Sequence, residues 1–317
     1  MTGTPAIPSG RASMTPAPGN AALAEPKSAP PFAPRRMLVA TDGRSRSDGT
    51  LRLALAIADR HRSSVDQVTV FEPRVPIPGA STGCSAVLCE HTDEPALVSL
   101  AARVRAQRHR VLDDAPDWPI HVSVGYPSVV IEQFARRARA DLIVTGLGPV
   151  LPDERKFSKE TPLAVAFTSD VPVLAVAPDA YRLPQRVMVV LEYDVASVRA
   201  ASVAMELVAP GGVVHLVYVR RGAPPWTLES SWALDRLYGA AEHDAEGKGV
   251  TLERLVVDGD PIPAILAAAE HVGTELIATA LHGTTLAQRN VIANLAAPLL
   301  RGARCSVLVV PGERIEH

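Results

Sequence analysis

Short, mostly apolar runs alternate with amphipathic segments along the first half of the chain. Runs typical of strands buried on both faces occur at residues 37–41, 68–71, 120–124, 142–145 and 173–176. Between them, apolar side chains recur at helical spacing over residues 51–61, 95–112, 130–138 and 163–168. Strands that alternate with helices in this way predict a doubly wound parallel α/β sheet with helices on both faces.

The second half of the chain repeats this pattern. Its predicted strands are residues 187–191, 213–219, 252–257, 276–279 and 307–310, and its predicted helices are residues 195–208, 226–245, 262–269 and 295–300. The repeat is visible in the sequence as well, because Gly125-Tyr126-Pro127 recurs as Gly259-Asp260-Pro261, 134 residues later (259 − 125). The same offset relates residues 141–148 to 275–282 and 171–176 to 305–310. Two homologous domains in tandem are therefore expected.

The predicted domains are residues 36–178 and 186–312. A short linker, residues 181–185, contains Pro184 and leaves little room for independent motion, so the two domains are expected to pack together. Residues 1–35 contain eight prolines among Ala, Ser, Gly and Thr. Such a segment cannot bury enough apolar surface to offset the entropy lost on ordering, and it is predicted to be a disordered tail.

The composition is that of a globular chain without a nucleic-acid or membrane surface. Hydrophobic residues make up 47% and charged residues 21% of the 317 residues, and the formal net charge is −2. Neither that charge nor the 4% aromatic content favours nucleic acid or anionic membranes. No apolar run approaches the roughly 18 residues of a spanning helix, and no signal-peptide core follows the start. Three cysteines, Cys84, Cys89 and Cys305, argue against a disulfide framework, so a cytoplasmic location is expected.

Three motifs mark the ends of the predicted elements. Asp42-Gly43 ends the first strand, Gly-x-Pro opens the third helix of each half, and a Pro-Val-Leu-x-Val type sequence at residues 172–176 supplies a final strand. In this order, and doubled, they resemble the universal stress protein family over about residues 36–178 and 186–312. The resemblance implies two tandem five-stranded sheets of order 3-2-1-4-5, a Rossmann-like fold related to adenine nucleotide alpha-hydrolases. It also implies an internal pseudo-dimer with the two final strands at the interface.

Nucleotide-binding members of that family carry Gly-x-x-Gly, nine further residues, and then Gly-Ser or Gly-Thr. The glycines let the backbone approach phosphate, and the hydroxyl caps a helix whose dipole favours an anion. In the second half the corresponding residues are Ala280, Gly283, Ala293 and Asn294. His282 matches a residue common just before the second Gly of the motif. Since Asn294 can still cap a helix, the resemblance implies that the second half keeps part of the phosphate side.

The first half departs further from this motif. Its corresponding residues are Gly146, Pro149, Lys159 and Glu160. Pro149 has no amide to donate, and Glu160 places negative charge where phosphate would lie. On the base side of the site, the first half is the one that keeps the family residue. Asp42 matches the family's strand-one Asp, whereas the second half has Glu192 followed by Tyr193. Neither half keeps both sides of the site.

The topology points to the same loops without help from the resemblance. In a doubly wound sheet, ligands bind beyond the carboxyl ends of the strands where the strand order reverses, here between the first and fourth strands of each half. The structural alternative is that the acidic residue caps the first helix and the glycines turn the chain. The candidate nucleotide-binding residues at these two crevices are Asp42, Gly146, Glu192, His282, Gly283 and Asn294.

No catalytic or metal-binding group stands out in the sequence. Cys84-x4-Cys89-x-His91 matches no standard zinc spacing, and neither a Ser-His-Asp or Cys-His order nor a Gly-x-Ser-x-Gly elbow is found. Arg44 and Arg46 could meet an anion over the first crevice, with a solvated loop face as the alternative. The sequence therefore predicts no metal and no catalytic activity.

The favoured interpretation is a tandem universal stress protein with degenerate nucleotide sites and no bound cofactor, acting in a stress response through interaction or regulation. The alternative is that the second crevice binds ATP or another adenine nucleotide. A nucleotide-dependent enzyme of related α/β layout is a third interpretation, for which the sequence offers no catalytic cluster. A homo-oligomer and a protein partner both remain open.

Overall fold

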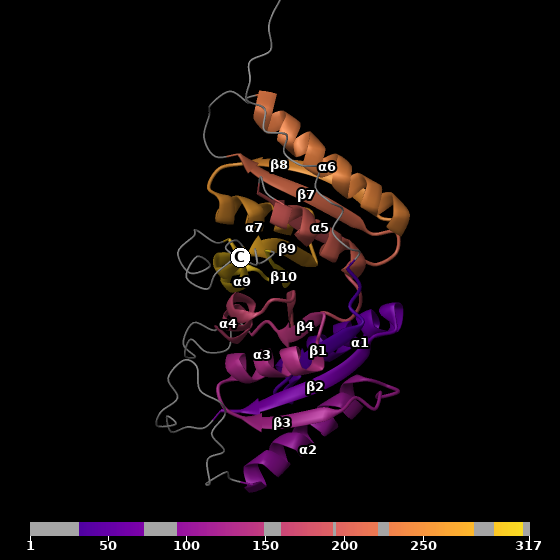
Figure 1. Cartoon of the computed structure of the whole chain (residues 1–317), viewed down its shortest axis with the longest axis vertical. Coiled ribbons are helices and arrows are strands. Elements are labelled where there is room, and N and C mark those ends of the chain that lie inside the picture. Colours follow the sequence, from indigo (N-terminus) through magenta and orange to yellow (C-terminus); the bar gives the residue numbers. More distant parts are fainter. Residues whose placement is uncertain are drawn as a thin grey trace, which may run out of the picture. The chain divides into compact units, whose positions relative to one another are not determined.

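The first half of the chain folds as the predicted alternation of strands and helices. The computed structural model describes residues 32–72, 94–148, 160–192, 195–220, 228–281 and 295–312. The elements of the first half (Figure 1) are β1 (Arg36–Ala40), the 3-10 turn η1 (Ser45–Ser47), α1 (Asp48–His61), β2 (Ser64–Phe71), α2 (Glu94–Val111), β3 (Ile120–Val124), α3 (Pro127–Ala138), β4 (Leu142–Gly146), α4 (Glu160–Thr168) and β5 (Val173–Val176).

The second half repeats this order. Its elements are β6 (Arg186–Leu191), α5 (Val195–Leu207), β7 (Val213–Arg220), α6 (Leu228–Lys248), β8 (Thr251–Asp258), α7 (Pro261–His271), β9 (Leu276–Leu281), α9 (Ala296–Gly302) and β10 (Ser306–Pro311). The predicted offset is kept, since α3 and α7 begin 134 residues apart at Pro127 and Pro261 (261 − 127), and so do β4 and β9 at Leu142 and Leu276 (276 − 142).

All ten strands form one sheet, in the order β3-β2-β1-β4-β5-β10-β9-β6-β7-β8. Within each half the strands are parallel, so the predicted order 3-2-1-4-5 is confirmed for both halves. The halves meet where β5 pairs with β10 in antiparallel orientation. The final strands therefore lie at the shared interface, as expected for an internal pseudo-dimer, and they join the two five-stranded sheets into one mixed sheet.

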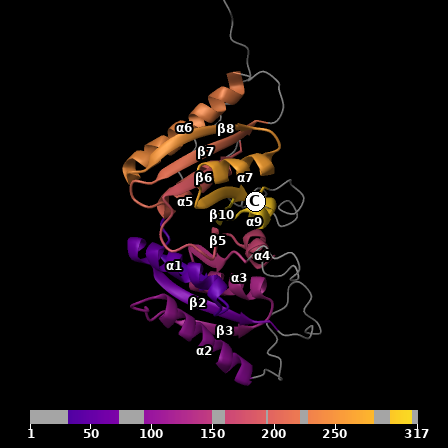
Figure 2. The ribbon, with the colours of Figure 1, turned by 180° about the vertical axis from the view of Figure 1, so that it is seen from behind.

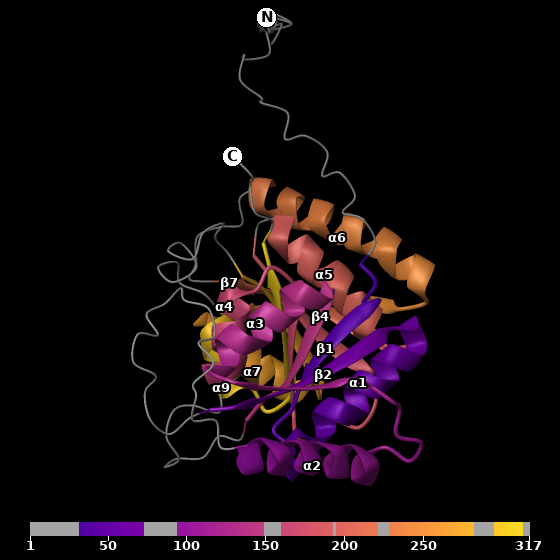
Figure 3. The ribbon, with the colours of Figure 1, turned by 60° about the horizontal axis from the view of Figure 1, so that its bottom comes forward.

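Helices cover both faces of the sheet (Figures 1 and 2). On one face α1, α2, α5 and α6 enclose a core that includes Val39, Leu174 and Leu308. On the other face α3, α4, α7 and α9, grouped together in Figure 3, enclose a core that includes Val173 and Val309. Because side chains alternate along each strand, neighbouring residues of β5 and β10 contribute to opposite cores. Both cores consequently continue across the boundary between the halves.

The two Gly-x-Pro motifs have the predicted structural role. Gly125 and Gly259 adopt φ values of 147° and 122°, a region that favours glycine because it has no Cβ. Pro127 and Pro261 then occupy the first turn of α3 and α7, where the missing proline N–H is not needed. These residues place the turn between a strand and its following helix at the same point in each half.

Polar contacts outside the sheet also connect the two halves. At the end of α1, His61 Nε2 lies 2.9 Å from the main-chain oxygen of Glu206, and Arg60 donates to the main-chain oxygen of Val208. The Glu206 carboxylate in turn pairs with Lys248 Nζ at 2.9 Å, and both side chains are largely buried. The end of α1 is therefore fixed against α5 and α6 of the other half.

The described residues begin at Phe32, which lies within residues 1–35, the segment predicted from the sequence to be a disordered tail. Phe32 packs against the core on the α1 side, Pro34 is buried, and the Ser63 hydroxyl donates to the Pro34 main-chain oxygen. Residues 32–35 therefore pack against the first domain, because Phe32 supplies apolar surface that the Pro-rich and Ala-rich residues before it lack.

Replacing Leu174 with alanine should lower the free energy of unfolding by about 2–5 kcal/mol, the usual cost of emptying a packed leucine site. Leu174 is 0% exposed and lies opposite Leu308 in the β5–β10 pair. Val256→Ala, at a site 46% exposed on β8, should cost less than about 1 kcal/mol. Urea unfolding followed by circular dichroism measures both. Equal losses in the two variants would contradict the central role of the β5–β10 contact.

Candidate functional site

The structure brings the described candidate residues to the ends of the strands where they were expected. β1 pairs with β4, with Ala40 opposite Thr145, so Asp42 and Gly146 both follow at the same carboxyl edge. Glu192 directly follows β6, whose neighbour in the sheet is β9. His282, Gly283 and Asn294 lie outside the described residues, as do Tyr193, Pro149 and Lys159, and of Glu160 only its place at the start of α4 is described.

The carboxylate of Asp42 takes part in four contacts within its own loop. Its Oδ1 accepts from the Arg44 N–H at 3.1 Å and lies 2.9 Å from the Ser47 hydroxyl. Its Oδ2 accepts from Arg46 Nε at 3.0 Å and from Arg46 Nη2 at 2.7 Å. These four contacts engage both carboxylate oxygens, although the one Ser47 proton is shared with the Arg44 main-chain oxygen at 2.9 Å. Asp42 thereby connects Arg44, Arg46 and Ser47 within the segment between β1 and α1.

Two opposing effects set the pKa of the Asp42 carboxyl. Burial raises this pKa, because the ionised form loses hydration. The hydrogen bond from Arg44, the charge and hydrogen bonds of Arg46 and the hydroxyl of Ser47 together lower it by more, and the pKa lies below its ordinary value. Asp42 is therefore ionised in the folded protein at neutral pH and paired with a cation from its own loop.

Two side chains of helix α2 also contact the segment between β1 and α1. Arg103 Nε donates to the main-chain oxygen of Asp42 at 3.1 Å, and Gln107 Nε2 lies within 2.9 Å of Ser47 Oγ and of Asp48 Oδ1. A Cβ added at Gly43, where φ is 75°, would lie 2.9 Å from the Arg103 side chain. The loop that follows β1 is thus covered by α2, a helix that the sequence pattern did not assign to the candidate site.

Gly146 does not turn the chain. It is the last residue of β4, and its φ lies outside the left-handed region. A Cβ at this position would lie 3.3 Å from Thr50 Oγ1 and 3.7 Å from Ser47 Cβ. The missing side chain therefore lets the start of α1 pack closely onto the end of β4.

In the second half, Glu192 leads into α5 by a main-chain contact. Its N–H donates to the hydroxyl of Ser197, a fully buried residue of α5, at 2.9 Å. Glu192 itself is half-buried. The acidic residues after β1 and β6 are therefore held differently, Asp42 through its carboxylate and Glu192 through its main chain among other contacts.

Part of the Asp42 arrangement could have been read from the sequence. Asp42 and Arg46 are four residues apart, a spacing at which opposite charges meet in helical turns, and the structure pairs them directly. The structure therefore gives Arg46 a contact with Asp42 that neither interpretation weighed for it, an anion ligand or a solvated loop face, had included. Arg103 and Gln107 gave no such signal, because they reach the site from 61 and 60 residues away.

Among the described residues, no three side chains of His, Cys, Asp or Glu are grouped closely enough to hold a metal ion. The candidate ligands Cys84, Cys89 and His91 lie outside those residues. Of the helices that are described, none combines the length and the hydropathy needed to cross a bilayer.

The fold and the doubled crevice define a class: tandem α/β proteins with a nucleotide-binding-like fold. The family model described as "Universal stress protein family" matches the chain twice, over residues 34–177 and 184–311. The chain belongs to the universal stress protein family and carries two of its domains in tandem. No curated protein matches the chain in sequence.

Solved structures support the same fold. A universal stress protein from Archaeoglobus fulgidus DSM 4304 superposes with a TM-score of 0.60 at 19% identity, covering 90% of this chain and 99% of that chain. A functionally unknown protein from Pseudomonas aeruginosa PAO1 has a TM-score of 0.53 at 14% identity, with 88% and 93% covered. Both span the two halves, so the tandem arrangement as a whole has structural relatives.

Replacing Asp42 with asparagine should destabilise the protein at pH 7 by about 1 kcal/mol, a value reduced for partial exposure. Because the folded-state pKa of Asp42 is lowered, its stabilising contribution is full above the unfolded-state value near 3.9 and is lost as pH falls through the folded-state pKa. The difference between wild type and variant should therefore shrink below about pH 4. Urea unfolding over a pH series measures it.

Asp59→Asn is the matched control, since it removes the same charge from the exposed side of α1. Its effect on the free energy of unfolding should stay within about 0.5 kcal/mol. A loss for Asp42→Asn that matches the control, or that grows on acidification, would show that the Asp42–Arg46 contact does not stabilise the loop.

Proposed function

We propose that this chain is a cytoplasmic tandem universal stress protein whose two nucleotide crevices are degenerate, and that it acts in a stress response by interaction or regulation and not by catalysis. The observation that carries the proposal is the engagement of both Asp42 carboxylate oxygens by its own loop. If this residue served as the base-side contact, an adenine amino group would have to donate to one of these oxygens. Both already hold contacts from Arg44, Arg46 or Ser47.

Displacing Arg46 to make room for a base would be unfavourable. Arg46 holds Oδ2 through two of its nitrogens, and a guanidinium that grips a carboxylate in this way is stronger than a neutral hydrogen bond. The neutral amino group of adenine could not replace that charge. The first crevice also lacks phosphate-side features, because Pro149 has no amide and Glu160 brings a negative charge to the start of α4.

The second crevice supports the alternative function, binding of ATP or another adenine nucleotide. Gly283 and Asn294 keep one backbone-opening and one capping residue of the motif, and neither carries charge. Against this, Glu192 stands at the base side where the motif has Asp, and bulky Tyr193 follows it. Any nucleotide affinity should therefore be weak and should reside in the second half.

The internal pairing of the halves supports an interaction role over simple self-association through the final strands. β5 and β10 hydrogen-bond to each other, so neither is an edge strand that could pair with a second copy of the chain. The edges of the described sheet are β3 and β8 instead. Within the described residues, these edges and the helical surfaces are open to a second copy or a protein partner.

Isothermal titration calorimetry with ATP and with cAMP tests the nucleotide part of the proposal. For the wild type we expect no saturable heat, or a Kd weaker than about 1 mM, equivalent to about 4 kcal/mol of binding free energy. Any residual heat should disappear in Asn294→Asp, since a carboxylate repels phosphate at a helix start. Asn20→Asp, which makes the same substitution outside both domains, should leave the heat unchanged.

Two results would overturn the proposed function in different ways. Tight binding that is lost in Asn294→Asp and kept in Asn20→Asp would mean that the second crevice is a working nucleotide site, and the alternative function would replace the proposed one. Tight binding that survives Asn294→Asp would mean that nucleotide binds elsewhere and that Gly283 and Asn294 do not form the phosphate side of a site.

A further inference from the structure

A pocket of about 540 Å³ lies where the two halves meet. Its walls come from the segment after β5 and the linker (residues 177–184), the end of α7, the start of β9, and the turn from α9 into β10, with Leu53 of α1. Of the candidate nucleotide residues that the structure describes, Asp42, Gly146 and Glu192, none lines it. Its size falls in the range of small-molecule sites, about 300–1,000 Å³.

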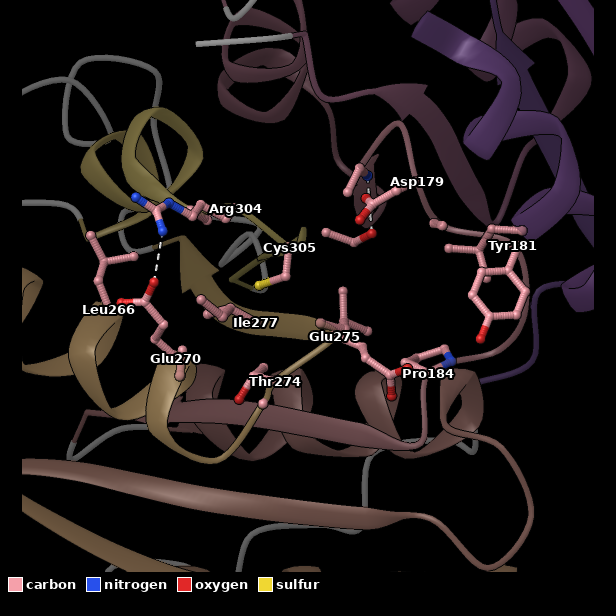
Figure 4. Close-up of a pocket in the computed structure, with 18 of the residues that line it drawn as sticks. Asp179, Tyr181, Pro184, Leu266, Glu270, Thr274, Glu275, Ile277, Arg304 and Cys305 are labelled. Atoms are coloured by element: carbon pink, nitrogen blue, oxygen red, sulfur yellow. Dashed lines mark hydrogen bonds and ion pairs between the residues drawn. The ribbon is translucent and has the colours of Figure 1, made fainter. Parts of the chain in front are cut away.

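The pocket has an apolar wall from the second half. Leu276 and Ile277 of β9 are almost completely buried, and Leu266 and Ala269 of α7 lie beside them. The thiol of Cys305, a free cysteine at the turn before β10, shares this wall. Figure 4 shows the pair Glu270–Arg304 at one end and Tyr181 at the other, with Cys305 and Thr274 between them.

Most of the charged groups around the pocket are already paired. Glu270 accepts from Arg304 at 2.7 Å. Glu275 accepts from the Gln185 N–H at 2.7 Å and pairs with Arg182 at 3.5 Å. Both guanidinium groups of the lining are thus engaged with carboxylates, and an anionic ligand would have to displace one of those carboxylates.

Asp179 is different from the other charged groups. It is exposed on the linker side of the pocket, and among the described residues no hydrogen-bond or ion-pair partner for its carboxylate is present. Its negative charge also acts on the thiol of Cys305. The pKa of this thiol is raised to about 11, first by burial and further by the charge of Asp179. The pocket therefore combines an apolar wall with one unbalanced negative charge.

We propose that this pocket binds a small amphipathic amine, with its ammonium group against Asp179 and its hydrocarbon chain against Leu266. An ammonium balances the one carboxylate that, among the described lining residues, lacks a partner, whereas a carboxylate or phosphate ligand would add to the negative charge. The hydrocarbon is removed from water against the half-buried side chain of Leu266 on α7. The site is independent of both crevices, so it does not depend on the function proposed above.

Cys305 supplies a reporter for the test. In a Cys84→Ser/Cys89→Ser background it is the remaining cysteine, and its reaction with 4,4′-dithiodipyridine at fixed pH gives a rate. n-Hexylamine, cationic below a pKa near that of lysine, about 10.4, should slow this reaction in a saturable manner. Sodium hexanoate and n-hexanol at the same concentrations should slow it less. Calorimetry with n-hexylamine should give the same half-saturation.

Asp179→Asn should raise the half-saturating concentration of n-hexylamine roughly fivefold, the effect of about 1 kcal/mol from a partly exposed ion pair. Asp59→Asn, the same change at an exposed position of α1, should leave it unaltered, and melting temperatures should show that all variants are folded. Absence of protection, equal protection by hexanoate or hexanol, or protection unchanged in Asp179→Asn would each overturn the proposal.

Discussion

The antiparallel pairing of β5 with β10 is the contact on which the rest of the structure depends. Its three residue pairs, centred on Leu174 opposite Leu308, are almost fully buried, so the hydrogen bonds between these strands form away from water. Through this pairing each half covers the strand edge that the other would leave exposed. The helices on each face then enclose one core that continues across both halves.

This pairing also decides where sites can form. Because β5 and β10 run in opposite directions, the strands of the two halves also run in opposite directions. The carboxyl ends of the strands of one half therefore lie on the side where the strands of the other half have their amino ends. The two crevices are thereby kept apart. The same reversal brings the end of β5 and the linker against the amino ends of β9 and β10, and the pocket that contains Asp179 and Cys305 forms there.

Asp42 illustrates how one carboxylate can fix a loop. It follows β1, and Arg46 one helical turn later, the Arg44 amide and Ser47 all contact it. The loop thereby gains a fixed conformation next to α2. A carboxylate paired in this way exchanges its partner only at the cost of leaving a charge unpaired.

The sequence by itself determined the alternation of elements, the 134-residue repeat and the glycine and proline positions at the start of α3 and α7. These are set by local periodicity and by backbone limits of single residues, which a linear pattern records. Only the tertiary structure decided that ten strands share one sheet, that Arg103 and Gln107 cover Asp42, and that Asp179 faces a pocket with Cys305. Those contacts join residues tens to more than a hundred positions apart, and they follow from packing two cores together, which no spacing along the chain encodes.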